Sequence, residues 1–199
     1  MTPLTKFAMY ALVVIATVTG ALWFVGGKKK ECSTEVTLNA TPQEVFVFLS
    51  TPKYLKQWIS GLQEMDLIDT PEGQSPMYEI VMLDKGRKVT LRQEVIKYAQ
   101  DSMIALQNKS DSLVSTAIFR LEEAGEDKTK LSYKVKEEGK GLARVLIPLN
   151  KNPTQERIRE ECRMLKRVIE ENLDKLELEP PVSPMDDATT PEEEPVPVS

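Results

Sequence analysis

The chain has 199 residues, of which 41% are apolar and 29% charged, a composition that fits one globular domain with appendages. Its formal net charge of -5 argues against the basic face of a nucleic-acid-binding protein. It contains no histidine, which excludes histidine-based catalytic triads and the usual zinc ligand sets, and its two cysteines form no CxxC motif. We therefore expect neither a metal nor a cofactor.

The first predicted element is a membrane anchor. Residues 7–25, "FAMYALVVIATVTGALWFV", form a run of 19 residues without a charge. A helix of that length covers roughly 28 Å, about one hydrocarbon core. Tyr10 lies near one end, and Trp23 and Phe24 lie near the other, where aromatic side chains favour the membrane interface. A cleaved signal peptide or a lipoprotein is disfavoured, because neither a small-x-small cleavage site nor a lipobox before Cys32 follows the run.

The lysines beside this run predict its orientation. Lys28, Lys29 and Lys30 follow the apolar run, whereas Lys6 and the amino terminus precede it. The positive-inside rule then predicts a single-pass membrane protein whose following domain lies in the cytoplasm.

Two short helices are predicted after the strand-like run "STEVTLNA". Thr41 is a good N-cap, Pro42 suits the first helical position, and Glu44 completes a capping box. Pro52, in a second Thr-Pro pair, ends this helix and begins the next. For Tyr54 and Trp58 in the second helix, packing on the sheet edge is favoured over direct contact with a ligand.

Six further strand-like runs follow in close order, separated by turn signals such as "DKG", "KSD" and "EAGED". Short connections favour antiparallel pairing, since parallel strands need long crossovers. Alternation places Gln93 on the inward face with its apolar neighbours, and it places Tyr133 inward in the last strand. The six runs cover residues 63–69, 77–83, 87–98, 102–108, 113–122 and 130–137.

A long amphipathic helix is predicted over residues 153–176. Its apolar residues recur at spacings of three and four, which form one helical face that packs on the sheet. They are Ile158, Cys162, Leu165, Ile169, Leu173 and Leu176. Residues 180–199 then carry six prolines and five acids, which account for the whole net charge. We expect a disordered, solubilising tail there in preference to a docking motif.

Three stretches resemble the START-like, or helix-grip, superfamily in its polyketide cyclase/dehydrase-like (SRPBCC) branch. They are "VTLNATPQEVFVFLSTPKYLKQWISGLQEMDLID" at residues 36–69, "KLSYKVKEEGKGLARVLIPL" at residues 130–149, and the amphipathic helix. The resemblance implies an α+β fold in which a curved antiparallel sheet of about seven strands grips the long helix over a hydrophobic cavity. The domains would be an anchor with its Lys-rich flank (1–30), the START-like domain (31–179) and the tail (180–199).

The resemblance also implies a function. We expect a membrane-tethered domain that binds or transfers a hydrophobic small molecule, such as a lipid or isoprenoid, under the long helix. Two alternatives stay open: a cyclase or dehydratase acting through Tyr133 or Tyr78, and a non-catalytic adaptor acting through its surface or acidic tail, with a protein partner that the sequence does not identify. The candidate ligand-binding residues are Trp58, Tyr78, Leu91, Gln93, Phe119, Tyr133, Leu165 and Ile169.

Overall fold

The computed structural model of the protein describes residues 29–68, 75–84, 86–141, 143 and 153–176, with single positions at 10, 13, 14, 17 and 20. Within this part of the chain, no helix is long and apolar enough to cross a membrane. Most of the predicted anchor and the whole acidic tail lie outside the described residues. The predictions made for those two segments therefore stay predictions.

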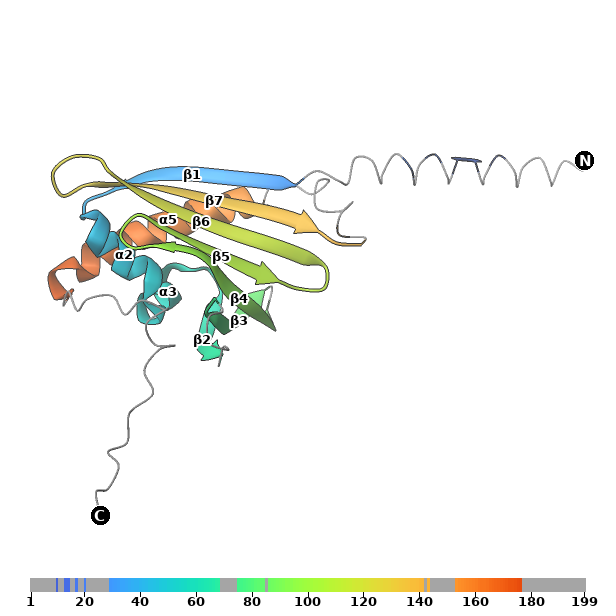
Figure 1. Ribbon diagram of the computed structural model, residues 1–199, viewed down its shortest axis with the longest axis horizontal. Coiled ribbons are helices and arrows are strands. Elements are labelled where there is room, and N and C mark those ends of the chain that lie inside the picture. Colours follow the sequence, from blue (N-terminus) through green and yellow to red (C-terminus); the bar gives the residue numbers. More distant parts are fainter. Residues whose placement is uncertain are drawn as a thin grey trace, which may run out of the picture.

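Seven antiparallel strands form one sheet in the order β1-β7-β6-β5-β4-β3-β2 (Figure 1). The strands after β1 form a simple meander, as the short turn signals predict, and β1 adds to the free edge of β7. This confirms the predicted helix-grip fold, with strand bounds close to the predicted ones. The strands are β1 (Lys30–Leu38), β2 (Leu62–Ile68), β3 (Met77–Asp84), β4 (Arg87–Ala99), β5 (Met103–Lys109), β6 (Leu113–Glu123) and β7 (Thr129–Gly139).

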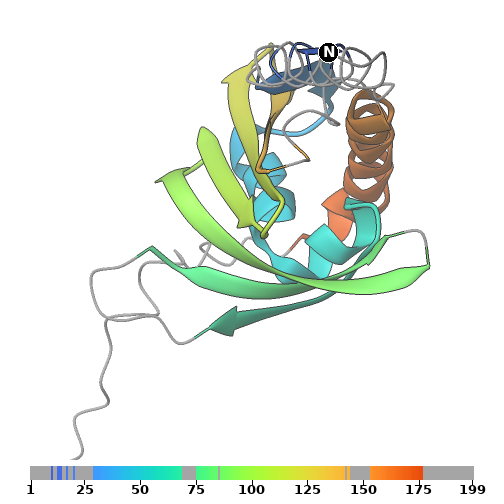
Figure 2. The ribbon, with the colours of Figure 1, turned by 90° about the vertical axis from the view of Figure 1, so that its right-hand side faces the viewer.

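Three helices lie on the concave side of the curved sheet, as Figure 2 shows. They are α2 (Pro42–Ser50), α3 (Pro52–Trp58) and α5 (Pro153–Asn172), which a short 3-10 turn (Leu173–Lys175) continues. Helix α5 buries the predicted apolar face, including Ile158, Leu165 and Ile169. It packs mainly against β1 and α3. The central strands of the sheet therefore lie opposite α5, but they do not pack closely against it over its whole length.

The two Thr-Pro pairs begin two separate helices, as predicted, but the two threonines differ. The Thr41 hydroxyl accepts a hydrogen bond from the Glu44 backbone N–H at 3.3 Å, and the Thr41 N–H donates to Glu44 Oε2 at 2.7 Å. This is a complete capping box. Thr51 has an extended backbone between α2 and α3, and its side chain makes no capping hydrogen bond to the described residues.

This difference gives a matched test of the capping box. Thr41→Ala is expected to lower the free energy of unfolding by about 1 kcal/mol, because it removes the acceptor for an otherwise unpaired helical N–H. Thr51→Ala should have a much smaller effect, since its hydroxyl does not cap α3. Urea unfolding of both variants measures this, and equal losses would contradict a stabilising role of the capping box.

Candidate functional site

Two adjoining cavities lie between the sheet and α5. The outer chamber has a volume of about 460 Å³ and is lined by β3, β4, β5 and β6 on one side and by the start of α5 on the other. The inner chamber, of about 70 Å³, lies deeper under the same helix. Both are lined by Met82, Asn108, Ser115 and Arg157, so the inner chamber is a continuation of the outer one. The outer volume lies within the range of small-molecule sites, about 300–1,000 Å³.

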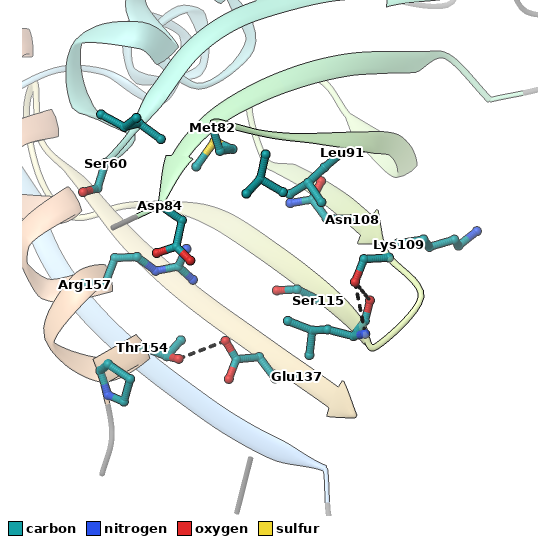
Figure 3. Close-up of a pocket in the computed structure, with 15 residues that line it drawn as sticks. Ser60, Met82, Asp84, Leu91, Asn108, Lys109, Ser115, Glu137, Thr154 and Arg157 are labelled. Atoms are coloured by element: carbon teal, nitrogen blue, oxygen red, sulfur yellow. Dashed lines mark hydrogen bonds between the residues drawn. The ribbon is translucent and has the colours of Figure 1, made fainter. Parts of the chain in front are cut away.

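A polar band crosses the floor of these chambers. Gln93 on β4 pairs in register with Asn108 on β5, which pairs with Ser115 on β6, which in turn pairs with Glu137 on β7. Directly paired residues in a sheet point to the same face, so these four side chains form a row. Figure 3 shows Asn108, Ser115 and Glu137 from the sheet on the side facing Thr154 and Arg157 of α5. Thr154 donates a hydrogen bond to Glu137 at 2.9 Å across this space.

The next row on the floor is apolar. Val95, Leu106, Ala117 and Val135 pair across the same four strands, two residues further along each strand. On the mouth side, Leu83, Val89 and Leu91 line the outer chamber. The polar row is thus enclosed by apolar surface on both sides.

A buried carboxyl–phenol pair forms the far wall of the inner chamber. The Tyr133 hydroxyl on β7 donates to Glu161 Oε2 on α5 at 2.9 Å, and the Ser60 backbone N–H donates to Glu161 Oε1 at 3.3 Å. The two side chains are only 5% and 2% exposed, and both line the inner chamber. The Phe119 ring stacks on Tyr133 with centroids 4.3 Å apart. The pair joins α5, β7 and the turn after α3 at one point.

Burial controls the ionisation of this pair. It raises the pKa of Glu161, while the nearby Arg157 charge and the hydrogen bonds from Tyr133 and Ser60 act in the opposite direction. Burial, reinforced by the Glu161 charge, raises the pKa of Tyr133 well above its ordinary value. The adjacent Cys162 thiol, also buried, has its pKa raised to about 12. Tyr133 therefore stays a hydrogen-bond donor at neutral pH.

The raised pKa predicts how stability depends on pH. Folded protein holds the Glu161 proton more tightly than the unfolded chain does. The stability that this adds in acid is lost as the pH rises through the raised folded-state pKa. Glu161→Gln removes this titration, so the variant should gain thermal stability relative to the wild type as the pH is raised from about 4 to about 8.

The measurement is the unfolding midpoint of both proteins across that pH range. Glu170→Gln changes an exposed carboxyl on the same helix and is the control. A difference between wild type and Glu161→Gln that is the same at every pH would contradict the prediction.

The predicted site residues divide into two groups. Leu91 lines the outer chamber, and Gln93, Phe119 and Tyr133 line the inner one. The others lie in or against the packed core and line neither chamber: Trp58, Leu165 and Ile169 are buried, and Tyr78 is half-buried against the core. Trp58 thus takes the packing role that the sequence favoured.

Four polar residues of the inner chamber escaped the sequence prediction: Asn108, Ser115, Arg157 and Glu161. A signal for Glu161 was present, because it lies three residues after Ile158 and four before Leu165 and so falls on the apolar face of α5. Strand alternation likewise places Asn108 with the inward Leu106. A polar residue at an inward position is the common signal.

Comparison with known proteins agrees with this architecture. The model of the family described as polyketide cyclase / dehydrase and lipid transport matches residues 29–179. No curated protein matches the chain in sequence. Solved structures match with TM-scores of 0.51 to 0.60 and identities of 9% to 16%, so they show a shared fold alone.

Three of these solved structures illustrate the range of proteins that share the fold. The Zhui aromatase/cyclase from Streptomyces sp. R1128 has a TM-score of 0.60 and 10% identity, covering 73% of this chain and 96% of its own. A START superfamily protein from Mycobacterium smegmatis has a TM-score of 0.56 and 16% identity, with 73% and 97% covered. The protein TTHA0849 from Thermus thermophilus has a TM-score of 0.58 and 15% identity, with 71% and 98% covered.

Proposed function

Since this chain belongs to the polyketide cyclase / dehydrase and lipid transport family, we propose that it is a membrane-tethered module that binds or transfers a hydrophobic small molecule. The observation that carries the proposal is the outer chamber of about 460 Å³, which continues into the inner chamber under α5. Apolar side chains of three strands line it, and burying a ligand's apolar surface there would supply affinity at about 25 cal/mol per Å² before ordering costs.

The position of the chamber supports the tether. Lys30, the first residue of β1, pairs with Glu137, which lines the outer chamber. The chamber therefore lies at the end of the sheet where the N-terminal segment joins the domain. Residues 26–29 separate the proposed anchor from β1, and four extended residues span at most roughly 14 Å. The mouth would thus lie close to the bilayer.

Part of the rim of the chamber is also apolar. Leu83 and Val89, on either side of the β3–β4 turn, line the outer chamber while 46% and 38% exposed. Exposed large apolar side chains beside a cavity mouth suit passage of a hydrophobic molecule between membrane and protein.

A cavity-filling variant tests the binding function. Ser115 lines both chambers, so Ser115→Trp should block them, whereas Val114→Trp places the same side chain on the opposite face of β6. The full chain and both variants are purified from cells in the same detergent, and bound molecules are extracted and identified by mass spectrometry. We expect a hydrophobic compound enriched in wild type and Val114→Trp and lost in Ser115→Trp. Equal recovery of the compound from all three proteins would contradict the proposal.

The proposed location is single-pass in the membrane with the domain in the cytoplasm, because three lysines follow the apolar run. Protease treatment of sealed right-side-out vesicles tests this. The domain should be protected until the vesicles are opened, and cleavage in intact vesicles would reverse the orientation.

A cyclase or dehydratase is the second candidate, favoured by the buried Glu161–Tyr133 pair in the inner chamber. A carboxyl whose pKa is raised by burial can act as a general acid or base. If the protein is a dehydratase, Glu161→Gln should retain a compound heavier by one water than the compound recovered with the wild type. Recovery of the same compound from both proteins would contradict a dehydratase and would leave binding as the function.

A further inference from the structure

The inner chamber contains two side-chain amides that make no hydrogen bond within the described part of the chain. Gln93 is 7% exposed and lines the chamber, and its amide makes no hydrogen bond to any described residue. Asn108 Oδ1 is buried and also has no hydrogen-bond partner in the described part of the chain. The two residues are direct cross-strand partners on β4 and β5, so both amides belong to one small area of the floor. Buried polar groups without partners are rare in folded proteins.

We propose that Gln93 and Asn108 form the recognition site for an uncharged hydroxyl group at the polar end of the bound molecule. This inference rests on the proposed binding function and deepens it. The apolar body of the molecule then occupies the outer chamber. The ligand class is an amphipathic alcohol or phenol.

The hydrogen-bonding capacity of the amides identifies the group. Each amide offers N–H donors and a carbonyl acceptor, and a hydroxyl donates one hydrogen bond and accepts two. A hydroxyl can therefore satisfy the acceptor of one amide and the donor of the other together. A hydrocarbon end can satisfy neither, and it would leave both amides unpaired in a site that has lost its water.

Burial in the inner chamber disfavours an ionised group. Glu161 lines the same chamber at 2% exposure, and burial there raises its pKa, so a ligand carboxylate placed beside it would meet the same penalty on its charged form. A ligand ammonium would meet Arg157, which lines both chambers. Both Glu161 oxygens already accept hydrogen bonds, from Ser60 and Tyr133.

The dimensions set the direction of binding. The inner chamber, of about 70 Å³, has room for a small polar group, since a water molecule takes about 30 Å³ of liquid volume. Along β4, Val89 and Leu91 line the outer chamber and Gln93 lines the inner one. The hydroxyl thus enters first, and the apolar body follows toward the rim.

Three probes of one shape test the inference: 2-naphthol, naphthalene and 2-naphthoate. Equilibrium dialysis measures their binding to the full chain in lipid nanodiscs, with empty nanodiscs subtracted. The wild type should bind 2-naphthol about tenfold more tightly than either other probe. Gln93→Leu and Asn108→Leu should each bring the ratio of 2-naphthol to naphthalene affinity close to one while keeping naphthalene binding.

Gln107→Leu is the matched control, because Gln107 lies beside Asn108 on the opposite face of β5 and bonds to Thr116 at 3.2 Å. It should keep the wild-type ratio. Equal affinity of the wild type for 2-naphthol and naphthalene, or an unchanged ratio in both Gln93→Leu and Asn108→Leu, would overturn the hydroxyl site and leave the binding function standing. No binding of any probe by any form would overturn the binding function itself.

Discussion

Replacing Trp58 with alanine is expected to lower the free energy of unfolding by about 3–5 kcal/mol, as large buried aromatic residues do when truncated. Trp58 is 2% exposed at the end of α3, and its ring meets Phe119 edge-on with centroids 5.9 Å apart. Truncation would leave a cavity between α3 and the sheet that rigid neighbours can only partly fill.

A second contribution comes from the indole N–H, which donates to the backbone oxygen of Phe48 at 3.0 Å. Phe48 lies in the last turn of α2, where helical carbonyls lack partners within their own helix. Trp58 therefore caps one helix from the end of the next. Its loss would leave a buried carbonyl unpaired, which costs about 1–3 kcal/mol.

Trp58→Phe is the intermediate case, because it keeps one aromatic ring in the core while removing the donor and part of the ring volume. Denaturant unfolding should give a smaller loss for phenylalanine than for alanine. A loss for Trp58→Ala below about 1 kcal/mol, within the range of ordinary surface changes, would contradict this account of the core.

Gly61→Ala is the second substitution with a large expected effect. Gly61 has φ of +82°, and a Cβ at this position would lie 2.6 Å from the backbone oxygen of Leu83. The Leu83 N–H also donates to the Gly61 oxygen at 2.7 Å, which fixes the two backbones against each other. Alanine would incur the strain of the left-handed backbone, about 1–3 kcal/mol, and would also force β3 away from the turn.

Gly86→Ala is a matched control, since Gly86 has φ of +80° but no described atom within 4 Å of the added Cβ. It should show the backbone contribution alone. The difference between the two losses in denaturant unfolding isolates the clash with Leu83. Equal losses would mean that β3 moves at no cost. Because Leu83 lines the outer chamber, Gly61→Ala should also weaken binding of a ligand there.

Local patterns predicted the fold well. The Thr41 capping box, the alternation in β7 and the apolar face of α5 each depend on residues close in sequence, and each is found as predicted. Alternation also placed Gln93 and Tyr133 on the inward face correctly.

The site was harder, because its parts depend on contacts far apart in the chain. The partner of Tyr133 is Glu161, 28 residues away. The place of Glu161 on the apolar face of α5 marks it as inward, but no local pattern tells which side chain it contacts there. The hydrogen bond from Trp58 to Phe48 joins two helices through a backbone oxygen. Every residue has such an oxygen, so the sequence does not indicate which one accepts. The volume of the chambers depends on how far the sheet curves away from α5, and no single residue encodes that curvature.

The position of β1 in the sheet has a consequence for how the protein is made. Among the described strands, β1 (Lys30–Leu38) leaves the ribosome first, yet its partner is β7 (Thr129–Gly139), which leaves last. At about 5–20 residues per second, β1 waits roughly 5–20 s for that partner to be synthesised. The meander from β2 to β7 can pair as it emerges, because each of its contacts is local. Closure of the β1–β7 edge is therefore the late, long-range step of folding, and the interval before it is when the nascent chain is most open to pairing with the wrong strand.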